Sequence, residues 1–388
     1  MRRITLEVVV FLCFMGLSPI GCGEDTDLPA DAASTDTNTT DTGATETDST
    51  DADTSDTGST ATDPTDADPS GDTPTDRCSM IEASIGDAGF GDSVDVRCED
   101  DVAYLISSTY PSHDVMNGIT GTNEQIPVPA AGLESPVPLN PVMASAVTTR
   151  DSSLGIAVNG VPIYDYTAGG EIEMDADGNS AYDANLDTTL IGQLDHCGGH
   201  SGRGDDYHYH KEPSCMLAAM PNAGNNPILG WAYDGFPIYG KANPDGSAIG
   251  PSDLDPCNGQ ADETFGYRYH TSDTQPYIIK CLKGEVDEPS LPRVSPFRDG
   301  GRPIAVSGLS YTTTANSDGT ETRRLSYTYQ SADYYIEYAT RADSDYCFDI
   351  DARMCDADQN SCNVTEQNGC FCRSLPSGES RPSGCQGG

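Results

Sequence analysis

The sequence predicts a mainly β fold: a single large β-rich domain built from two related half-units, with a small disulfide-rich tail at the C-terminus. Three observations lead to this prediction. No long stretch spaces its apolar residues at the 3.6-residue period of an amphipathic helix, whereas glycine and proline recur throughout. Short runs rich in tyrosine, threonine and aliphatic residues alternate with turn residues, as is typical of strands. A cluster of six cysteines lies between Cys347 and Cys385.

The first 22 residues look like a bacterial lipoprotein signal. Met-Arg-Arg precedes the apolar run VVVFLCFMGL, which is shorter than the roughly 20 residues of a membrane-spanning helix. Gly21 directly precedes Cys22, which predicts Cys22 as the lipidated first residue of the mature chain, with simple secretion as the alternative. We therefore expect an exported protein, attached to the bacterial cell envelope or surface only through a lipid anchor.

Residues 23–77 are expected to form a disordered acidic tether. They are almost all Asp, Thr, Ser, Ala, Gly and Pro, with sixteen acids and a single base, Arg77. Such a segment buries too little apolar surface to offset the entropy of the chain, and its like charges extend it. Beyond it, residues 78–388 still carry 45 acids against 17 bases, a balance of −28, which excludes nucleic acid and anionic lipid headgroups as partners.

The cysteines predict disulfides. An even number in an exported chain indicates disulfide bonds rather than zinc–thiolate sites. Their spacing suggests three groups, namely the first two cysteines, the next four and the last six, and the pairing stays open. We expect a β-rich domain over residues 78–340 and a Cys-rich segment over residues 341–388. The twelve cysteines are Cys78, Cys98, Cys197, Cys215, Cys257, Cys281, Cys347, Cys355, Cys362, Cys370, Cys372 and Cys385.

Individual strands follow from local patterns. Strands are expected at DVAYLISST (101–109) and DYYIEYAT (333–340). LSYTTT (309–314) and TRRLSYTYQ (322–330) flank an Asp-Gly pair that a tight hairpin turn favours.

Two segments of the chain repeat one pattern: GIAVNGVPIYD (155–165) and GWAYDGFPIYG (230–240) agree at seven positions when Asn159 and Asp234 count as equivalent turn residues. Each predicts a hairpin, and each is followed by a tyrosine-histidine strand, YHYH (207–210) or YRYH (267–270). The repeat predicts two half-units about a pseudo-twofold axis.

Four of the six histidines lie between His196 and His210. Because side chains alternate along a strand, His208 and His210 point to one side, and His200 can fold back across the Gly-rich loop as a third ligand. Three neutral imidazoles suit zinc, copper, nickel or iron, of which copper or zinc is expected. A buried Tyr-His-Asp hydrogen-bond network and acid–base catalysis without metal remain alternatives. His270 is a fourth candidate ligand, and further candidates are His113, His196 and Asp234, although Asp234 also suits a turn.

These motifs together resemble the YHYH domain family of exported proteins, over roughly residues 109–284. The family pattern Cys-x-Gly-His maps onto Cys197, Gly199 and His200, followed by the YHYH motif at residues 207–210. Its second motif maps onto Tyr267, Tyr269 and His270, and the chain departs from it at Arg268. The family has no established activity, so the resemblance implies a fold and a set of important positions rather than a reaction.

Two classes of function follow. The first is an exported domain that binds copper or zinc through His200, His208, His210 and His270, either as a metalloenzyme with an open coordination position or as a closed, structural or sequestering site. The second is a surface binding or adhesion module for a glycan, protein or small molecule, in which tyrosines form the contact surface and the histidines are structural. The sequence does not identify a reaction.

Overall fold

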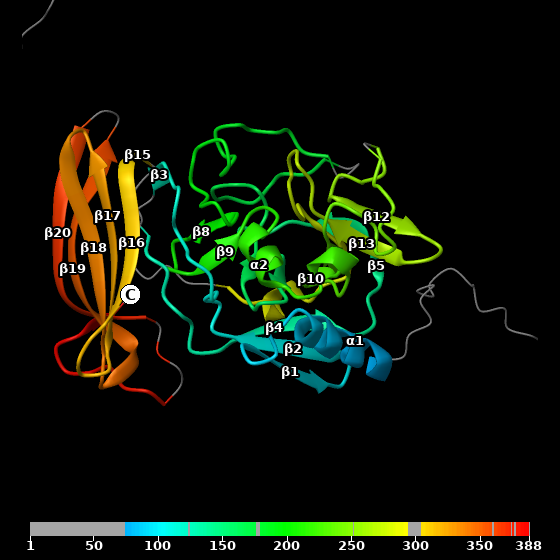
Figure 1. The fold of residues 1–388 in the computed structure, drawn as a ribbon, viewed down its shortest axis with the longest axis horizontal. Coiled ribbons are helices and arrows are strands. Elements are labelled where there is room, and N and C mark those ends of the chain that lie inside the picture. The colour runs from blue at the N-terminus through cyan, green and yellow to red at the C-terminus, as the bar shows by residue number, and fades with distance from the viewer. Residues whose placement is uncertain are drawn as a thin grey trace, which may run out of the picture. The chain divides into compact units, whose positions relative to one another are not determined.

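The computed structural model describes residues 74–387 apart from residues 123–124, 176–178, 251, 294–303, 359–360, 374 and 376–377. All described residues belong to one compact unit, Thr62–Gly388. The predicted signal segment 1–22 with Cys22, and the predicted tether up to residue 73, lie outside the described residues. The described part is mainly β, as predicted, with five sheets and two α-helices (Figure 1).

The largest sheet has eight short strands in the order β12-β13-β11-β10-β6-β7-β9-β8. Outward from the central antiparallel pair of β10 and β6, each side repeats one series of neighbours: a hairpin partner, a parallel strand and an antiparallel edge strand. Two related half-units would produce a symmetric strand order of this kind. That the halves are related stays a prediction. The strands are β6 Gly155–Ala157, β7 Pro162–Ile163, β8 Gly199–Ser201, β9 Tyr207–Tyr209, β10 Ile228–Ala232, β11 Pro237–Tyr239, β12 Gly259–Asp262 and β13 Gly266–His270.

The two repeated segments form the two predicted hairpins beside the centre of this sheet. β6 pairs with β7 across Asn159 and Gly160, and β10 pairs with β11 across Asp234 and Gly235. Gly160 has φ 80° and Gly235 has φ 88°, a region that glycine enters without steric cost. The Asn-Gly and Asp-Gly pairs therefore reverse the chain at equivalent points.

The central strands approach closely at the glycine that opens each repeated segment. A Cβ atom on Gly155 would lie 2.6 Å from the carbonyl oxygen of Trp231, and one on Gly230 would lie 2.7 Å from that of Ile156. Neither position accepts a side chain without a shift of backbone. This close approach explains why both segments begin with glycine.

A three-stranded antiparallel sheet with the order β1-β2-β4 packs beneath a helix, α1, that the sequence did not predict (Figure 1). α1 spans Pro74–Asp87, so it begins inside the predicted tether, and the Cys78–Cys98 disulfide links it to β1. Among its side chains whose burial the structure describes, Ile81 and Ile85 are the buried apolar ones, and two positions are too few to establish a helical period. The strands are β1 Val94–Glu99, β2 Val102–Ser107 and β4 Leu133–Pro138.

Shorter elements connect these sheets. β14 pairs with β5, and β15 pairs with β3, as two-stranded sheets. None of the helices within the described ranges has both the length and the apolar character to span a membrane. The elements are β3 Gly121–Thr122, β5 Met143–Thr148, β14 Leu282–Gly284, β15 Ile304–Ala305, helix α2 Ser214–Ala219, and the 3-10 helices η1 Ala223–Asn225 and η2 Glu288–Ser290.

The C-terminal part forms a six-stranded sheet in the order β16-β17-β18-β19-β20-β21. β16 and β17 form the predicted hairpin around Asp318 and Gly319. Because β18 pairs with β19, this sheet runs across the boundary predicted at residue 341. The strands are β16 Ser307–Ala315, β17 Glu321–Tyr329, β18 Ala332–Arg341, β19 Ser344–Asp358, β20 Ser361–Cys372 and β21 Gln386–Gly387.

All twelve cysteines predicted to form disulfides are paired. Every bond lies within one of the three groups that the spacing suggested, so the C-terminal region is disulfide-rich, as predicted. The pairs are Cys78–Cys98, Cys197–Cys215, Cys257–Cys281, Cys347–Cys372, Cys355–Cys362 and Cys370–Cys385.

The C-terminal sheet contacts the loop between β8 and β9. The Tyr338 hydroxyl donates to a carboxylate oxygen of Asp205 at 2.8 Å, and the Arg373 guanidinium donates to the Gly204 carbonyl oxygen at 2.7 Å. Asp205 is fully buried. The sheet thus fixes the loop that leads into the YHYH strand.

Candidate metal centre

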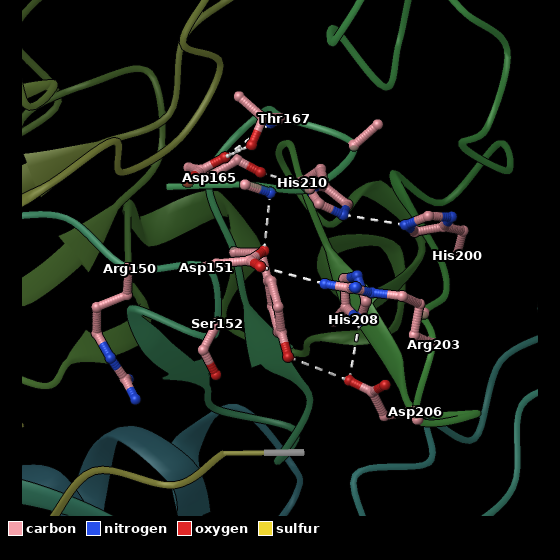
Figure 2. A pocket seen from close by; sticks show the side chains of 16 residues that line it. Arg150, Asp151, Ser152, Asp165, Thr167, His200, Arg203, Asp206, His208 and His210 are labelled. Atoms are coloured by element: carbon pink, nitrogen blue, oxygen red, sulfur yellow. Dashed lines mark hydrogen bonds and ion pairs between the residues drawn. The ribbon is translucent and has the colours of Figure 1, made fainter. Parts of the chain in front are cut away.

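Strands β8 and β9 bring His200, His208 and His210 together. The two strands pair antiparallel, with His200 directly opposite His208, and His210 follows the end of β9. One ligand atom from each of the three residues lies within 4.8 Å of the other two, and their exposed fractions are 6%, 4% and 2%. Figure 2 shows the three rings gathered at the wall of one pocket. Strand alternation and the antiparallel return of β8 therefore produce a buried trio of imidazoles.

Two of the three rings are held through their Nδ1 atoms. His210 Nδ1 contacts the carbonyl oxygen of Asp165, and His208 Nδ1 lies 3.0 Å from a carboxylate oxygen of Asp206. Both oxygens are acceptors, so each Nδ1 carries the proton and each Nε2 keeps its lone pair. A hydrogen bond of this kind to the far nitrogen is the usual support of a metal-binding histidine.

The shortest distance in the trio, 3.0 Å, joins His200 Nε2 to His210 Nε2. Two nitrogens bound to the same tetrahedral zinc ion lie roughly 3.3 Å apart, given zinc–nitrogen bonds of about 2.0–2.1 Å. The separation therefore fits two ligands of one ion with little movement. It equally fits a hydrogen bond in which His200 donates and His210 accepts.

Burial favours the neutral form of His200 and His210. Burial lowers the pKa of His200 well below 6.5, and the neighbouring His208 and His210 lower it further. Burial, followed by the proximity of His208, also lowers the pKa of His210 well below that value. Neutral imidazoles are the form that binds a cation. The three ring nitrogens thus form a donor set that could hold a metal ion.

Tyr164 and Asp206 complete the support of His208. The Tyr164 ring stacks on the His208 ring with centroids 3.9 Å apart, and its hydroxyl donates to Asp206 at 3.3 Å. No sequence pattern marks Tyr164, Asp165 or Asp206 as residues of the site. Tyr164 and Asp165 end the first repeated segment, so the pairing of β7 with β9 brings them to the histidines, whereas Asp206 directly precedes YHYH in the chain.

A small pocket opens beside the trio, with a cavity of about 80 Å³. This is room for roughly two or three water molecules, at about 30 Å³ each. Its wall includes all three histidines and Gly202. A Cβ atom on Gly202 would lie 2.5 Å from His208 Cε1, so the glycine makes space for the ring. The site is therefore buried in protein but adjoins a space for a small molecule.

The other predicted candidates lie outside this trio. His270 Nε2 lies 3.0 Å from Gln260 Nε2, and its Nδ1 lies 2.8 Å from the carbonyl oxygen of Gly240, in the other half of the sheet. Exposed His196 contacts the carbonyl oxygen of Asn117 at 3.1 Å. Neither histidine adds a ligand to the cluster of His200, His208 and His210.

Asp234 has a structural role in its hairpin. Its carboxylate accepts hydrogen bonds from the Tyr269 hydroxyl at 2.5 Å and from the backbone N–H groups of Lys283 and Gly284 at 3.0 and 2.9 Å. Burial raises its pKa. It thus fastens the turn to β13 and β14 and does not contact a histidine of the trio.

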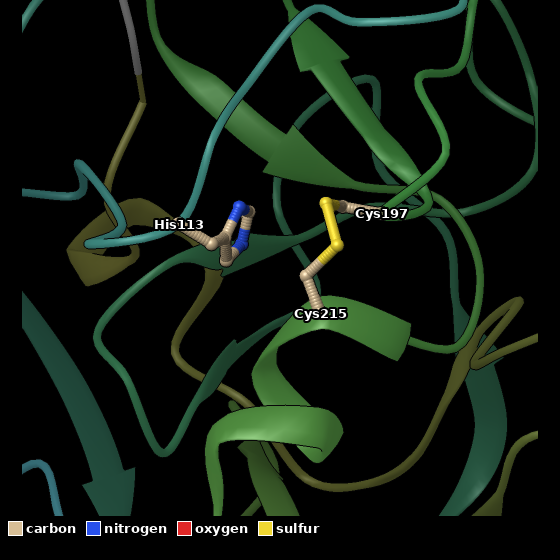
Figure 3. Close-up of side chains that lie close together, drawn as sticks. All are labelled: His113, Cys197 and Cys215. Carbon is tan, nitrogen blue, oxygen red and sulfur yellow. A yellow bond between two sulfur atoms is a disulfide. The ribbon is translucent and has the colours of Figure 1, made fainter.

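His113 lies near two cysteines, as Figure 3 shows, but they offer it no metal site. Cys197 and Cys215 form a disulfide, so neither provides the thiolate that a metal would bind. The imidazole instead contacts the Tyr209 hydroxyl at 2.7 Å. A second group, Cys347, Cys372 and Cys385, is likewise consumed by disulfides.

Comparison with known proteins finds one family similarity. Residues 134–249 match the family model described as YHYH protein, and this range includes the complete trio. No curated protein and no solved structure matches the chain. The matched range ends before the second tyrosine-histidine strand. Residues 134–249 are therefore similar to the YHYH family.

Proposed function

We propose that this protein binds one copper or zinc ion through His200, His208 and His210. The observation that carries the proposal is the pair of contacts that hold His208 Nδ1 to Asp206 and His210 Nδ1 to the Asp165 carbonyl. Each contact leaves Nε2 unprotonated, and His210 Nε2 lies 3.0 Å from His200 Nε2. A purely structural histidine does not need its second nitrogen free and facing two other imidazoles.

The ion keeps an open coordination position. Three side-chain ligands leave one position of a tetrahedral ion for water or a small molecule, which is the pattern of catalytic zinc sites. The cavity of about 80 Å³ beside the trio is the space for that fourth ligand. A closed storage site would instead take its fourth ligand from the protein.

The competing function is a binding or adhesion module without metal. The 3.0 Å contact between the Nε2 atoms of His200 and His210 favours it, because a hydrogen bond explains that contact without an ion. Against it, Tyr207, Tyr209 and Tyr269 are at most 1% exposed, so they do not supply a surface of tyrosines for a glycan or protein partner. We therefore rank metal binding first.

Export, with a lipid anchor at Cys22, is part of the proposal. Six disulfides among the described residues are typical of an oxidising compartment outside the cytosol. The pattern of residues 1–22 adds the expected signal and the lipidated cysteine. Labelling with a radioactive or clickable fatty acid in a bacterial host checks the anchor, with Cys22→Ala as the variant that loses the label.

Metal analysis tests the proposal. The full chain is stripped with a chelator, incubated with Zn²⁺ or Cu²⁺, desalted and assayed by mass spectrometry, alongside His208→Ala, His210→Ala and the control His196→Ala. We expect about one equivalent in the parent and the control, and a loss of metal in the two other variants with circular dichroism unchanged. A parent that takes up no metal, or variants that all retain it, favours the module.

A further inference from the structure

The second half of the eight-stranded sheet reproduces the framework of the histidine centre. Asp195 and Asp255 hold equivalent positions, 60 residues apart, and each carboxylate accepts the hydroxyl of a motif tyrosine: Tyr207 at 2.8 Å and Tyr267 at 2.9 Å. Each also caps the backbone N–H groups of the next cysteine and glycine. Equivalent disulfides, Cys197–Cys215 and Cys257–Cys281, follow.

The last histidine of each motif is held in the same way. His210 Nδ1 contacts the carbonyl oxygen of Asp165, and His270 Nδ1 contacts that of Gly240 at 2.8 Å. Asp165 and Gly240 are the final residues of the two repeated hairpin segments. The backbone of the second half thus orients His270 at the position equivalent to His210 in the trio.

The side chain that contacts this imidazole occupies the equivalent position in both halves, but it is a histidine in the first half and a glutamine in the second. His200 Nε2 lies 3.0 Å from His210 Nε2, and Gln260 Nε2 lies 3.0 Å from His270 Nε2. Gln260 stands 60 residues after His200. An amide nitrogen carries hydrogens and no available lone pair, so it donates to His270 and does not bind a cation.

We propose that this second centre is a counterpart of the histidine centre in which the guanidinium of Arg268 replaces the metal ion. Arg268 stands at the position equivalent to His208 and is only 1% exposed. Its guanidinium forms an ion pair with Asp262 at 2.7 Å and donates to Asn243 at 2.6 Å, and Asn243 in turn accepts from Gln260. The arginine therefore supplies a permanent positive charge inside the second cluster.

The residues around the two centres differ consistently with this exchange. Gly202 leaves room for the His208 ring, and its equivalent, Asp262, instead neutralises Arg268. Asp206 holds His208, and its equivalent is Gly266, whose carbonyl oxygen accepts from Arg268 at 3.0 Å. In the first half the carboxylate of Asp206 contacts His208, and in the second half the carboxylate of Asp262 pairs with Arg268.

The inference rests on the proposed metal site in the first half and predicts its stoichiometry: one ion per chain, not two. Changing both replaced ligands, in the double variant Gln260→His with Arg268→His, restores three imidazoles in the second half. Asp262 remains available to orient the new ring at position 268 or to bind the ion. We therefore expect this variant to gain a second site.

Zinc stoichiometry in the full chain tests the inference. The parent should hold one equivalent, the Gln260→His variant, which keeps the guanidinium, should also hold one, and the double variant should hold two. A folded double variant with one equivalent of zinc, or a Gln260→His variant with two, contradicts the proposal that Arg268 replaces a metal ion in the second centre. A double variant that folds only with zinc supports it. A parent with no zinc instead contradicts the proposed function, so the two failures are distinguishable. If the double variant does not fold at all, the Gln260→His result decides.

Discussion

Asp206 and His208 form a buried pair in which a carboxylate oxygen and Nδ1 lie 3.0 Å apart. This contact assigns the proton of His208 to Nδ1 and leaves Nε2 for a ligand role. The two residues are separated by one residue in the chain, so the start of β9 itself presents both the ligand and its support.

Replacing Asp206 by Asn should lower zinc affinity. The amide oxygen still accepts from Nδ1, but the negative charge that makes the imidazole more basic is lost, and we expect an affinity about 10- to 100-fold lower. Competition with a coloured chelator measures it. Asp151→Asn is the matched control, because Asp151 lines the same pocket but pairs with exposed Arg203. Equal zinc affinities for the two variants would mean that the Asp206 carboxylate does not strengthen metal binding by His208.

Gly202 should be required for the orientation of His208. A methyl group at this position would lie 2.5 Å from His208 Cε1, so Gly202→Ala displaces the ring and should weaken zinc binding about tenfold or more, as loss of a supporting contact does. Gly224→Ala is the control, since no atom lies within 4 Å of its expected Cβ. Unchanged affinity in Gly202→Ala would show that His208 does not need its observed position.

The contact between the C-terminal sheet and the loop before β9 should contribute to stability. Tyr338→Phe removes a donor from the buried Asp205 carboxylate, which should reduce the free energy of unfolding by about 1–3 kcal/mol. Tyr335→Phe, on the same strand, removes an exposed hydroxyl that contacts Asp351 at 3.1 Å and should change it by less than about 0.5 kcal/mol. Urea denaturation of the two variants compares them, and equal midpoints would contradict the coupling.

His270 should make the metal-free protein less stable in acid. Burial, assisted by the charge of Arg268, lowers the pKa of His270 to about 4, although its hydrogen bond to Gly240 acts in the opposite direction. The unfolded chain has the ordinary value near 6.5. Between these values the unfolded state binds a proton that the folded state does not, so stability falls as the pH drops from about 6.5 to about 4.

His270→Gln removes this contribution. The variant should lose less unfolding free energy than the parent over that pH range, whatever its stability at neutral pH. Urea denaturation of both proteins at closely spaced pH values gives the two slopes. Parallel slopes would mean that His270 takes up its proton equally in both states.

Much of the site was predictable because it depends on strand geometry. Alternation places His208 and His210 on one side, and the turn residues of SGRGDD allow His200 to return opposite them. The supporting groups were not predictable. Asp206 has the sequence context of a solvated loop, and Asp165 acts through its backbone carbonyl, which carries no residue-specific signal.

The fold was predictable to a similar degree. Asn-Gly and Asp-Gly pairs marked three hairpins, and the grouping of cysteines indicated disulfides without their pairing. Helix α1 was missed because two residues, Ile81 and Ile85, are the buried apolar ones among its described side chains. The position of His270 depends on the pairing of β13 with β11 at the far side of the sheet, which no local pattern specifies.

The most direct test of the central claim is the X-ray absorption spectrum of the zinc-loaded full chain. We expect three imidazole nitrogens and one further light atom at about 2.0–2.1 Å, with the imidazole scattering reduced in His210→Ala and unchanged in His196→Ala. A first shell with fewer than three imidazoles, or one that the His210 substitution leaves unaltered, would contradict it.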